Sequence, residues 1–182
     1  YMSDEFDVAS KIHLDLGLRA SFFQSLGPGM VNTYKPGLPK ETLTLIDTLN
    51  FTKGQTIKLF KNLEPRFGMR YKLSDDASIK VGYNRIFQYL QLITNTTAVT
   101  PVDIWQPSGY HFKPQRVDQF SLGYFKNIKE KKYEAFIEVY YKLLNNILDF
   151  KDGAQLILNQ QLETDLLQGK GRTYGAEMQI AK

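Results

Sequence analysis

The chain lacks cysteine altogether and has only two histidines, His13 and His111, among its 182 residues. Without thiols, disulfide frameworks, thiolate zinc sites and cysteine nucleophiles are excluded. Two histidines are too few for a histidine-rich metal centre, so we expect neither a bound metal nor another cofactor. No segment approaches the roughly 18 uninterrupted apolar residues of a membrane-spanning helix. The fold must therefore be inferred from the pattern of polar and apolar residues.

The formal net charge is +4 and the isoelectric point is about 9.1. Basic residues are scattered along the chain, and their densest run is Lys129-Glu130-Lys131-Lys132 in a segment typical of a turn. A nucleic-acid interface needs its positive charge gathered on one surface. We therefore expect no nucleic-acid partner.

Strict two-residue alternation of apolar and polar side chains is the strongest pattern in the sequence. Between Lys11 and Phe23, one alternating set is apolar from Ile12 to Phe22 and the other is mostly polar from His13 to Ser21. A strand separates two such sets onto opposite faces, whereas a helix would scatter them. The alternation recurs five times, which predicts six strands of about ten residues. The other five segments are residues 66–73, 78–84, 119–124, 134–142 and 174–180.

The connections between these strands alternate in length. Short turns are expected at 73–77 and 127–132, and long connections at 24–64, 88–115 and 143–171. Short turns at one end and long loops at the other are typical of outer-membrane barrels. The fold class we predict is all-β: an antiparallel, up-and-down transmembrane β-barrel segment of about six strands with long extracellular loops.

Strand length and aromatic placement agree with this prediction. About 9–11 tilted residues cross a bilayer, and aromatic rings favour the membrane interface. The residues expected at the short-turn rim are Tyr71, Tyr124 and Tyr133, and those expected at the long-loop rim are Phe22, Phe23, Tyr140 and Tyr141.

Glycines fall on the polar side of five predicted strands. A glycine inside a strand marks curvature or close approach of another group, so the polar side is interpreted as the concave wall of a lumen. The five are Gly17, Gly68, Gly82, Gly123 and Gly175.

Six strands are too few to close a membrane barrel, because the smallest known types have about eight. The first residues, Tyr1 to Asp4, show no signal peptide, and Gln179 to Lys182 resemble the middle of a strand. We therefore expect residues 1–182 to be one partial outer-membrane barrel domain.

Several stretches, in their order and spacing, resemble the barrel of TonB-dependent outer-membrane transporters, particularly the Bacteroidota type. The matching stretches are Leu14-Asp15-Leu16-Gly17-Leu18-Arg19, Glu64 to Tyr71, Ser78 to Arg85, Thr100 to Trp105, Lys113 to Arg116, Gln119 to Phe125, Glu138 to Lys142, Leu148 to Phe150 and Gly169 to Glu177. The likeness also implies that the fifth strand runs on past Lys142.

The resemblance implies a barrel of about twenty-two strands that imports a nutrient across the bacterial outer membrane. It implies as partners the membrane lipid, the remaining strands and plug of the parent protein, TonB through that parent, and a surface lipoprotein lid or other subunits of an outer-membrane complex. We expect this chain to contain neither the plug domain nor the TonB box of such a transporter. Because no acid–base or nucleophile constellation is present, we also expect no enzymatic activity.

Two groups of residues are candidates for contact. An aromatic loop group is expected to stack on a ligand or grip a partner: Trp105, Tyr110, His111 and Phe112. Charged residues of the predicted polar side are expected to face the lumen, where they would guide a solute or anchor the plug: Asp15, Arg19, Arg66, Arg70, Lys80, Glu134 and Glu138. No acid–base or nucleophile constellation predicts catalysis.

Two alternatives remain open at this stage. A soluble antiparallel β domain that binds carbohydrate through Trp105 would bury the same apolar stripes in a core. A barrel that has lost transport and serves as a structural subunit of a larger outer-membrane complex would share every pattern described above.

Overall fold

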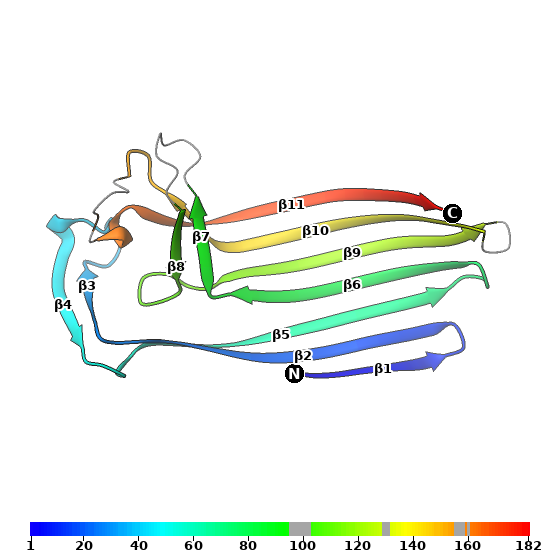
Figure 1. The fold of residues 1–182 in the computed structure, drawn as a ribbon, viewed down its shortest axis with the longest axis horizontal. Helices are drawn as coiled ribbons and strands as arrows, with labels where there is room; N and C mark the ends of the chain where they lie inside the picture. The colour runs from blue at the N-terminus through cyan, green and yellow to red at the C-terminus, as the bar shows by residue number, and fades with distance from the viewer. Residues whose placement is uncertain (95–102, 129–131, 155–158, 160) are drawn as a thin grey trace.

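The computed structural model describes residues 1–94, 103–128, 132–154, 159 and 161–182. Its main element is a sheet of seven strands, each antiparallel to the next in chain order. Figure 1 shows these strands side by side in one layer, with the short turns at the right. The strands are β1 (Met2–Ala9), β2 (Ile12–Leu26), β5 (Thr56–Lys72), β6 (Ala77–Gln88), β9 (Gln115–Ile128), β10 (Tyr133–Phe150) and β11 (Leu166–Ala181).

Two further hairpins lie within the long connections. One pairs β3 (Gly29–Tyr34) with β4 (Leu45–Phe51), and the other pairs β7 (Leu90–Thr94) with β8 (Asp103–Pro107). Both stand at the long-loop end of the sheet, at the left in Figure 1. The only helical elements in the described residues are the 3-10 turns η1 (Thr42–Thr44) and η2 (Leu162–Thr164). Neither they nor any other described segment forms a helix long and apolar enough to cross a membrane.

The predicted alternation places the apolar side chains on one face, which we call the apolar face. Its central row runs across the sheet through directly paired residues: Met69, Val81, Leu122, Val139 and Ala176. This face is open, since Leu122 is 51% exposed and Met178 is 77% exposed. A soluble sandwich would require a second layer over this face, and the described part of the chain supplies none. The opposite face is called the polar face.

Among the described residues, the main sheet has no hydrophobic core of its own. Five hydrophobic side chains are buried among the described residues, and four of them form one cluster at the long-loop end. That cluster joins Ile93, Phe112, Leu148 and Leu166, with Phe150 and Leu162 packed against it. Burial therefore holds the loops together, while backbone hydrogen bonds hold the wall.

The six predicted strands are present, and the structure adds a seventh. β1 was missed because Asp4 lies on the apolar face, where it pairs with Leu16 and interrupts the alternation between Met2 and Phe6. The six strands are also longer than expected, at 12 to 18 residues. β10 runs on past Lys142 to Phe150, as the resemblance implied. The alternation fades where the strands extend beyond the apolar zone.

Aromatic residues gather toward the edges of the apolar face, although not in every predicted position. A row of directly paired rings crosses the sheet through Tyr83, Phe120, Tyr141 and Tyr174. Phe22 and Tyr141 lie on this face as expected. Phe23 and Tyr140, expected beside them, belong to the polar face instead, because adjacent residues of a strand point in opposite directions.

Glycines of the polar face make room for inward rings. A Cβ on Gly123 would lie 2.7 Å from the Phe125 ring, and one on Gly175 would lie 2.6 Å from the Tyr140 hydroxyl. Phe125 in turn stacks on Phe136 at 5.5 Å between ring centroids. These two glycines thus allow aromatic side chains to lie flat along the wall.

We predict that Gly123→Val destabilises the protein by about 1–3 kcal/mol, because the added methyl groups overpack the Phe125 ring. Urea unfolding of the protein in detergent micelles measures the change. Gly169→Val is the matched control, since a Cβ there meets nothing within 4 Å. Equal effects of the two substitutions would contradict this role of Gly123.

Candidate functional site

The seven charged residues predicted to face a lumen all lie on the polar face. Asp15 pairs with Gly68, Arg66 with Gly17, and Arg19 with Glu64 across β2 and β5. Arg70 pairs with Lys80, and Lys80 and Glu138 both pair with Gly123. Glu134 shares this side of β10 with Glu138, because the two are four residues apart in one strand. The register therefore gathers charged residues from four strands, β2, β5, β6 and β10, on one surface.

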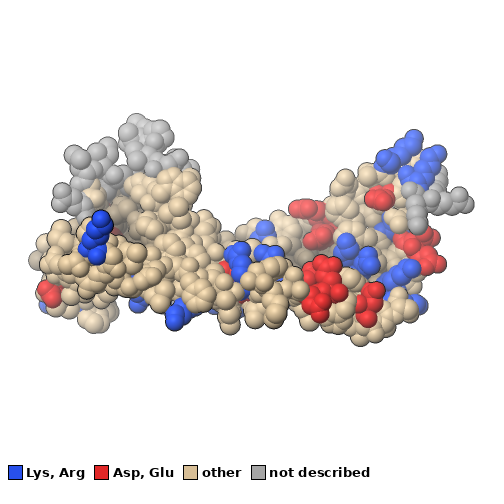
Figure 2. Space-filling view, turned by 60° about the horizontal axis from the view of Figure 1, so that its bottom comes forward, with Lys and Arg blue, Asp and Glu red and all other residues tan. Residues whose placement is uncertain are grey.

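Like charges stand directly opposite one another on this face. Arg70 pairs with Lys80 on β5 and β6, and Glu138 pairs with Glu177 on β10 and β11. Such pairs are destabilising by themselves, and water or an oppositely charged partner offsets the cost. In the face that Figure 2 shows, charged groups of both signs gather over the short-turn half and fewer are visible toward the long-loop end. The polar face is thus built to meet water or a charged surface.

A buried hydrogen-bond network ties one long connection to the polar face. Glu64 is 0% exposed and forms an ion pair with Arg19 at 2.6 Å. Ser21 donates to the other Glu64 oxygen at 2.7 Å and also contacts the Tyr89 hydroxyl at 2.6 Å. Asn62 donates to the same hydroxyl, and the Tyr89 ring stacks on Phe23 at 5.0 Å. Tyr89 therefore fixes the start of the β6–β9 connection against β2 and β5.

The long connections meet in a second group, which we call the rim cluster: Asn32, Tyr34, Lys40, His111, Phe112 and Glu163. Tyr34 and Asn32 both donate to Glu163 Oε1, at 2.9 and 3.1 Å. The His111 ring lies 5.7 Å from that of Tyr34, and Lys40 Nζ lies 5.2 Å above the Phe112 ring. Three loops that are far apart in the sequence are joined here.

A cavity of about 520 Å³ opens beside the rim cluster. Lys40, His111, Phe112, Lys151 and Glu163 are among its lining residues. Burial is the main cause that lowers the pKa of both His111 and Lys40, and each is also affected by a neighbouring lysine. Burial and the hydrogen bond to Glu163 raise the pKa of Tyr34 to about 12. The cavity thus combines an apolar wall with two lysines, two carboxylates (Glu41 and Glu163) and an imidazole that is neutral at pH 7.

The aromatic loop group predicted from the sequence is only partly brought together. Tyr110, His111 and Phe112 adjoin one another, with ring centroids 5.2 and 6.4 Å apart. Trp105 instead lies on β8 opposite Leu92, is 60% exposed, and does not line the cavity. Sequence reasoning missed Tyr34, Lys40, Tyr89 and Glu163. No local signal marks them, because their contacts span long stretches of chain.

We predict that acidification loosens the rim cluster. The folded loop holds the pKa of His111 below the ordinary 6.5. A released loop therefore binds a proton more readily, and packing is lost as the pH falls below about 6.5. Hydrogen exchange of residues 108–114, corrected for intrinsic rates, should show less protection at pH 5.5 than at pH 7.5.

The His111→Phe variant should show equal protection at the two pH values, because it lacks the titrating imidazole. It keeps Lys40 and Glu163, so it controls for titration of these neighbours. The same pH dependence in both proteins would show that another group is responsible.

A single antiparallel wall with an open apolar face, a polar opposite face and loops gathered at one end defines the class of outer-membrane β-barrels. The family comparison makes this specific. The family model described as TonB dependent receptor-like, beta-barrel matches residues 1–181, and the chain belongs to this family. The chain is located in the bacterial outer membrane.

Solved structures share the fold at low sequence identity. The alcaligin outer membrane receptor FauA from Bordetella pertussis matches with a TM-score of 0.58 and 14% identity, over 98% of this chain and 25% of that one. The ferric-catecholate import receptor Fiu from Escherichia coli K12, in its closed form, matches with a TM-score of 0.55 and 16% identity, over 98% and 24%. No curated protein sequence gives a significant match. The chain thus spans about a quarter of the length of these receptors.

Proposed function

We propose that this chain forms part of the transmembrane barrel of a receptor that imports a nutrient across the bacterial outer membrane. The open apolar face, with a charged polar face behind it, is the observation that supports this function. Lipid would cover the first face and the second would line an aqueous interior. The membership in the receptor-barrel family supports the same orientation.

In this proposal, further strands of the parent protein pair with the two sheet edges, β1 and β11. Unpaired backbone groups in hydrocarbon cost several kcal/mol each, so both edges must be covered. The plug of the parent would meet the polar face. Charged groups of the plug would neutralise the like-charged pairs of the polar face. Acidic groups would lie opposite Arg70 and Lys80, and basic groups would lie opposite Glu138 and Glu177. TonB would act through that parent, and a surface lipoprotein lid is an optional partner. We also propose that the parent protein is a receptor of the Bacteroidota type.

The cavity beside the rim cluster is the proposed point of first contact with the nutrient. It lies at the long-loop end, where Figure 1 places both accessory hairpins. Lys40 and Lys151 supply positive charge, the carboxylates of Glu41 and Glu163 supply negative charge, and Phe112 and Leu166 supply an apolar wall. This combination suits a polar solute that carries an anionic group for the lysines on an apolar or aromatic body. Trp105 remains a second, separate candidate for contact because of its exposure.

A growth experiment tests the function. We expect a strain that lacks the parent gene to lose growth when one nutrient from a panel of ferric chelates, vitamins and glycans is limiting. Loss of TonB should abolish growth on the same nutrient, because import is driven from the inner membrane. A barrel with Lys40→Gln and Lys151→Gln should restore growth only at raised nutrient concentration, and Lys53→Gln, a loop lysine outside the cavity, is the control.

Normal growth of the deletion strain on the whole panel, with the barrel present in the outer membrane of the parent strain, would contradict import. That result would favour the structural subunit of a larger outer-membrane complex.

A further inference from the structure

Charged residues stand on the apolar face just beyond its aromatic row, and the transport proposal gives them no role. One step along the strands from Tyr83 and Phe120, the next directly paired residues are Arg85 and Asp118. The same row continues through Leu143 to Arg172. Two residues along a strand correspond to about 6.6 Å. The outward surface therefore changes from apolar to cationic over a single step.

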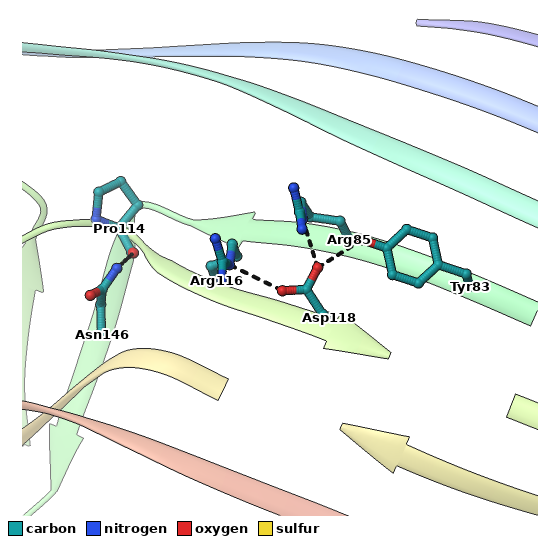
Figure 3. Close-up of polar contacts among 6 residues, drawn as sticks. All are labelled: Tyr83, Arg85, Pro114, Arg116, Asp118 and Asn146. Carbon is teal, nitrogen blue, oxygen red and sulfur yellow. Dashed lines mark hydrogen bonds and ion pairs between the residues drawn. The ribbon is translucent and has the colours of Figure 1, made fainter. Parts of the chain in front are cut away.

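Asp118 organises this group, which we call the Asp118 cluster: Tyr83, Arg85, Arg116 and Asp118. Arg85 Nε donates to Asp118 Oδ1 at 2.6 Å, and Arg116 Nε lies 3.1 Å from Oδ2. The Tyr83 hydroxyl donates to Oδ1 at 2.8 Å. Figure 3 shows the carboxylate held between the two guanidinium groups. Asp118 is 5% exposed, so the carboxylate is enclosed by its partners.

A bulge in the neighbouring strand fixes the start of β9. Asn146 is the extra residue of β10, and its φ of 60° is in the left-handed region that asparagine tolerates. Its side-chain amide donates to the Pro114 carbonyl at 2.9 Å, two residues before Arg116 (Figure 3). Arg116 is therefore positioned by the backbone of two strands rather than left free on a loop.

The carboxylate cannot use all the donors around it. Two guanidinium groups carry ten N–H donors, whereas a carboxylate offers about four acceptor sites, and Tyr83 already takes part of that capacity. The side chains of Arg85 and Arg116 remain 33% and 38% exposed. Two arginines and one aspartate leave the cluster with a net charge of +1. Arg172, in the same row, adds another positive charge on the outward side.

We propose that the Asp118 cluster binds the phosphate of a membrane lipid head group. Its position beside the aromatic row places it at head-group depth if the apolar face meets lipid, which is the orientation on which this inference rests. Guanidinium groups bind phosphate through paired, charge-assisted hydrogen bonds. A cluster that served only to join β6 to β9 would need no excess of positive charge. The lipid phosphate is the occupant that charge complementarity and position select together.

Lipid retention by the intact parent barrel tests the proposal. The protein, purified in a nonionic detergent, is titrated with diphosphorylated lipid A and with a neutral diacylglycerol, and bound lipid is counted by native mass spectrometry. We expect preference for the phosphorylated lipid. Arg85→Gln with Arg116→Gln should weaken its apparent affinity about tenfold or more. Arg70→Gln, which removes a cation from the polar face, is the matched control and should leave the affinity unchanged.

Two further variants separate lipid binding from a purely structural role. Asp118→Asn breaks the ion network but keeps both arginines, so it should lower thermal stability and retain the lipid preference. Arg116→Gln alone removes the arginine that lies farther from the Asp118 carboxylate. This single variant replaces the double variant in the lipid titration if the double variant does not assemble. It should weaken binding by a smaller factor.

Three results would overturn the proposal. They are unchanged lipid retention in the arginine variants, equal loss in Arg70→Gln, and displacement of the lipid by an equal concentration of inorganic phosphate. The last result would identify a site for free phosphate. Failure of nutrient import would leave this test unaffected, because the readout is lipid retention and not growth.

Discussion

The pairing of every backbone N–H and C=O is the constraint on which this structure depends. Hydrocarbon supplies no hydrogen-bond partner, so a chain that crosses a bilayer in strands must satisfy its polar groups between neighbours. The seven main strands pair in antiparallel order from β1 to β11, and only the outer edges of β1 and β11 are left for further strands of the parent protein in the proposed barrel. Side-chain burial contributes little to this wall, since the described hydrophobic cluster lies at the loop end. The ladder therefore defines the wall, and the side chains are left free to face two different solvents.

That freedom explains how charge is distributed. On the polar face, charged residues occur along the length of the wall, including like-charged neighbours that only water or a partner can accommodate. On the apolar face, the central and aromatic rows are free of charge from β5 to β11, and the Asp118 cluster begins one step beyond Tyr83 and Phe120. Outward charge thus starts where the membrane interface is expected. The rim cluster and the cavity beside it belong to the region beyond, where loops can pack around an ordinary small core.

The sequence predicted what two-residue periodicity can encode. Six strands, their faces and their short turns follow from alternation, because one face is uniformly apolar. β1 was not predicted, because Asp4 lies on the apolar face and interrupts the alternation there. The outer halves of β5 and β10 were not predicted from alternation, because strand residues outside the lipid need not alternate between apolar and polar. The rim cluster could not be found from sequence, since Tyr34 and Glu163 are 129 positions apart and meet only in the fold. His111 and Phe112 were identified from their aromatic character, but Trp105, chosen on the same grounds, lies elsewhere.

The most direct test of the central claim measures which solvent each face meets. The chain has no cysteine, so single cysteines can carry nitroxide spin labels at Leu122 and Val139 on the apolar face and at Ser121 and Glu138 on the polar face. In the parent barrel reconstituted in bilayers, the account predicts that labels at 122 and 139 are accessible mainly to dissolved oxygen. Labels at 121 and 138 should be shielded from the lipid phase and reached by a water-soluble paramagnetic reagent through the lumen. The reverse pattern, or equal accessibility of neighbouring positions, would contradict the account.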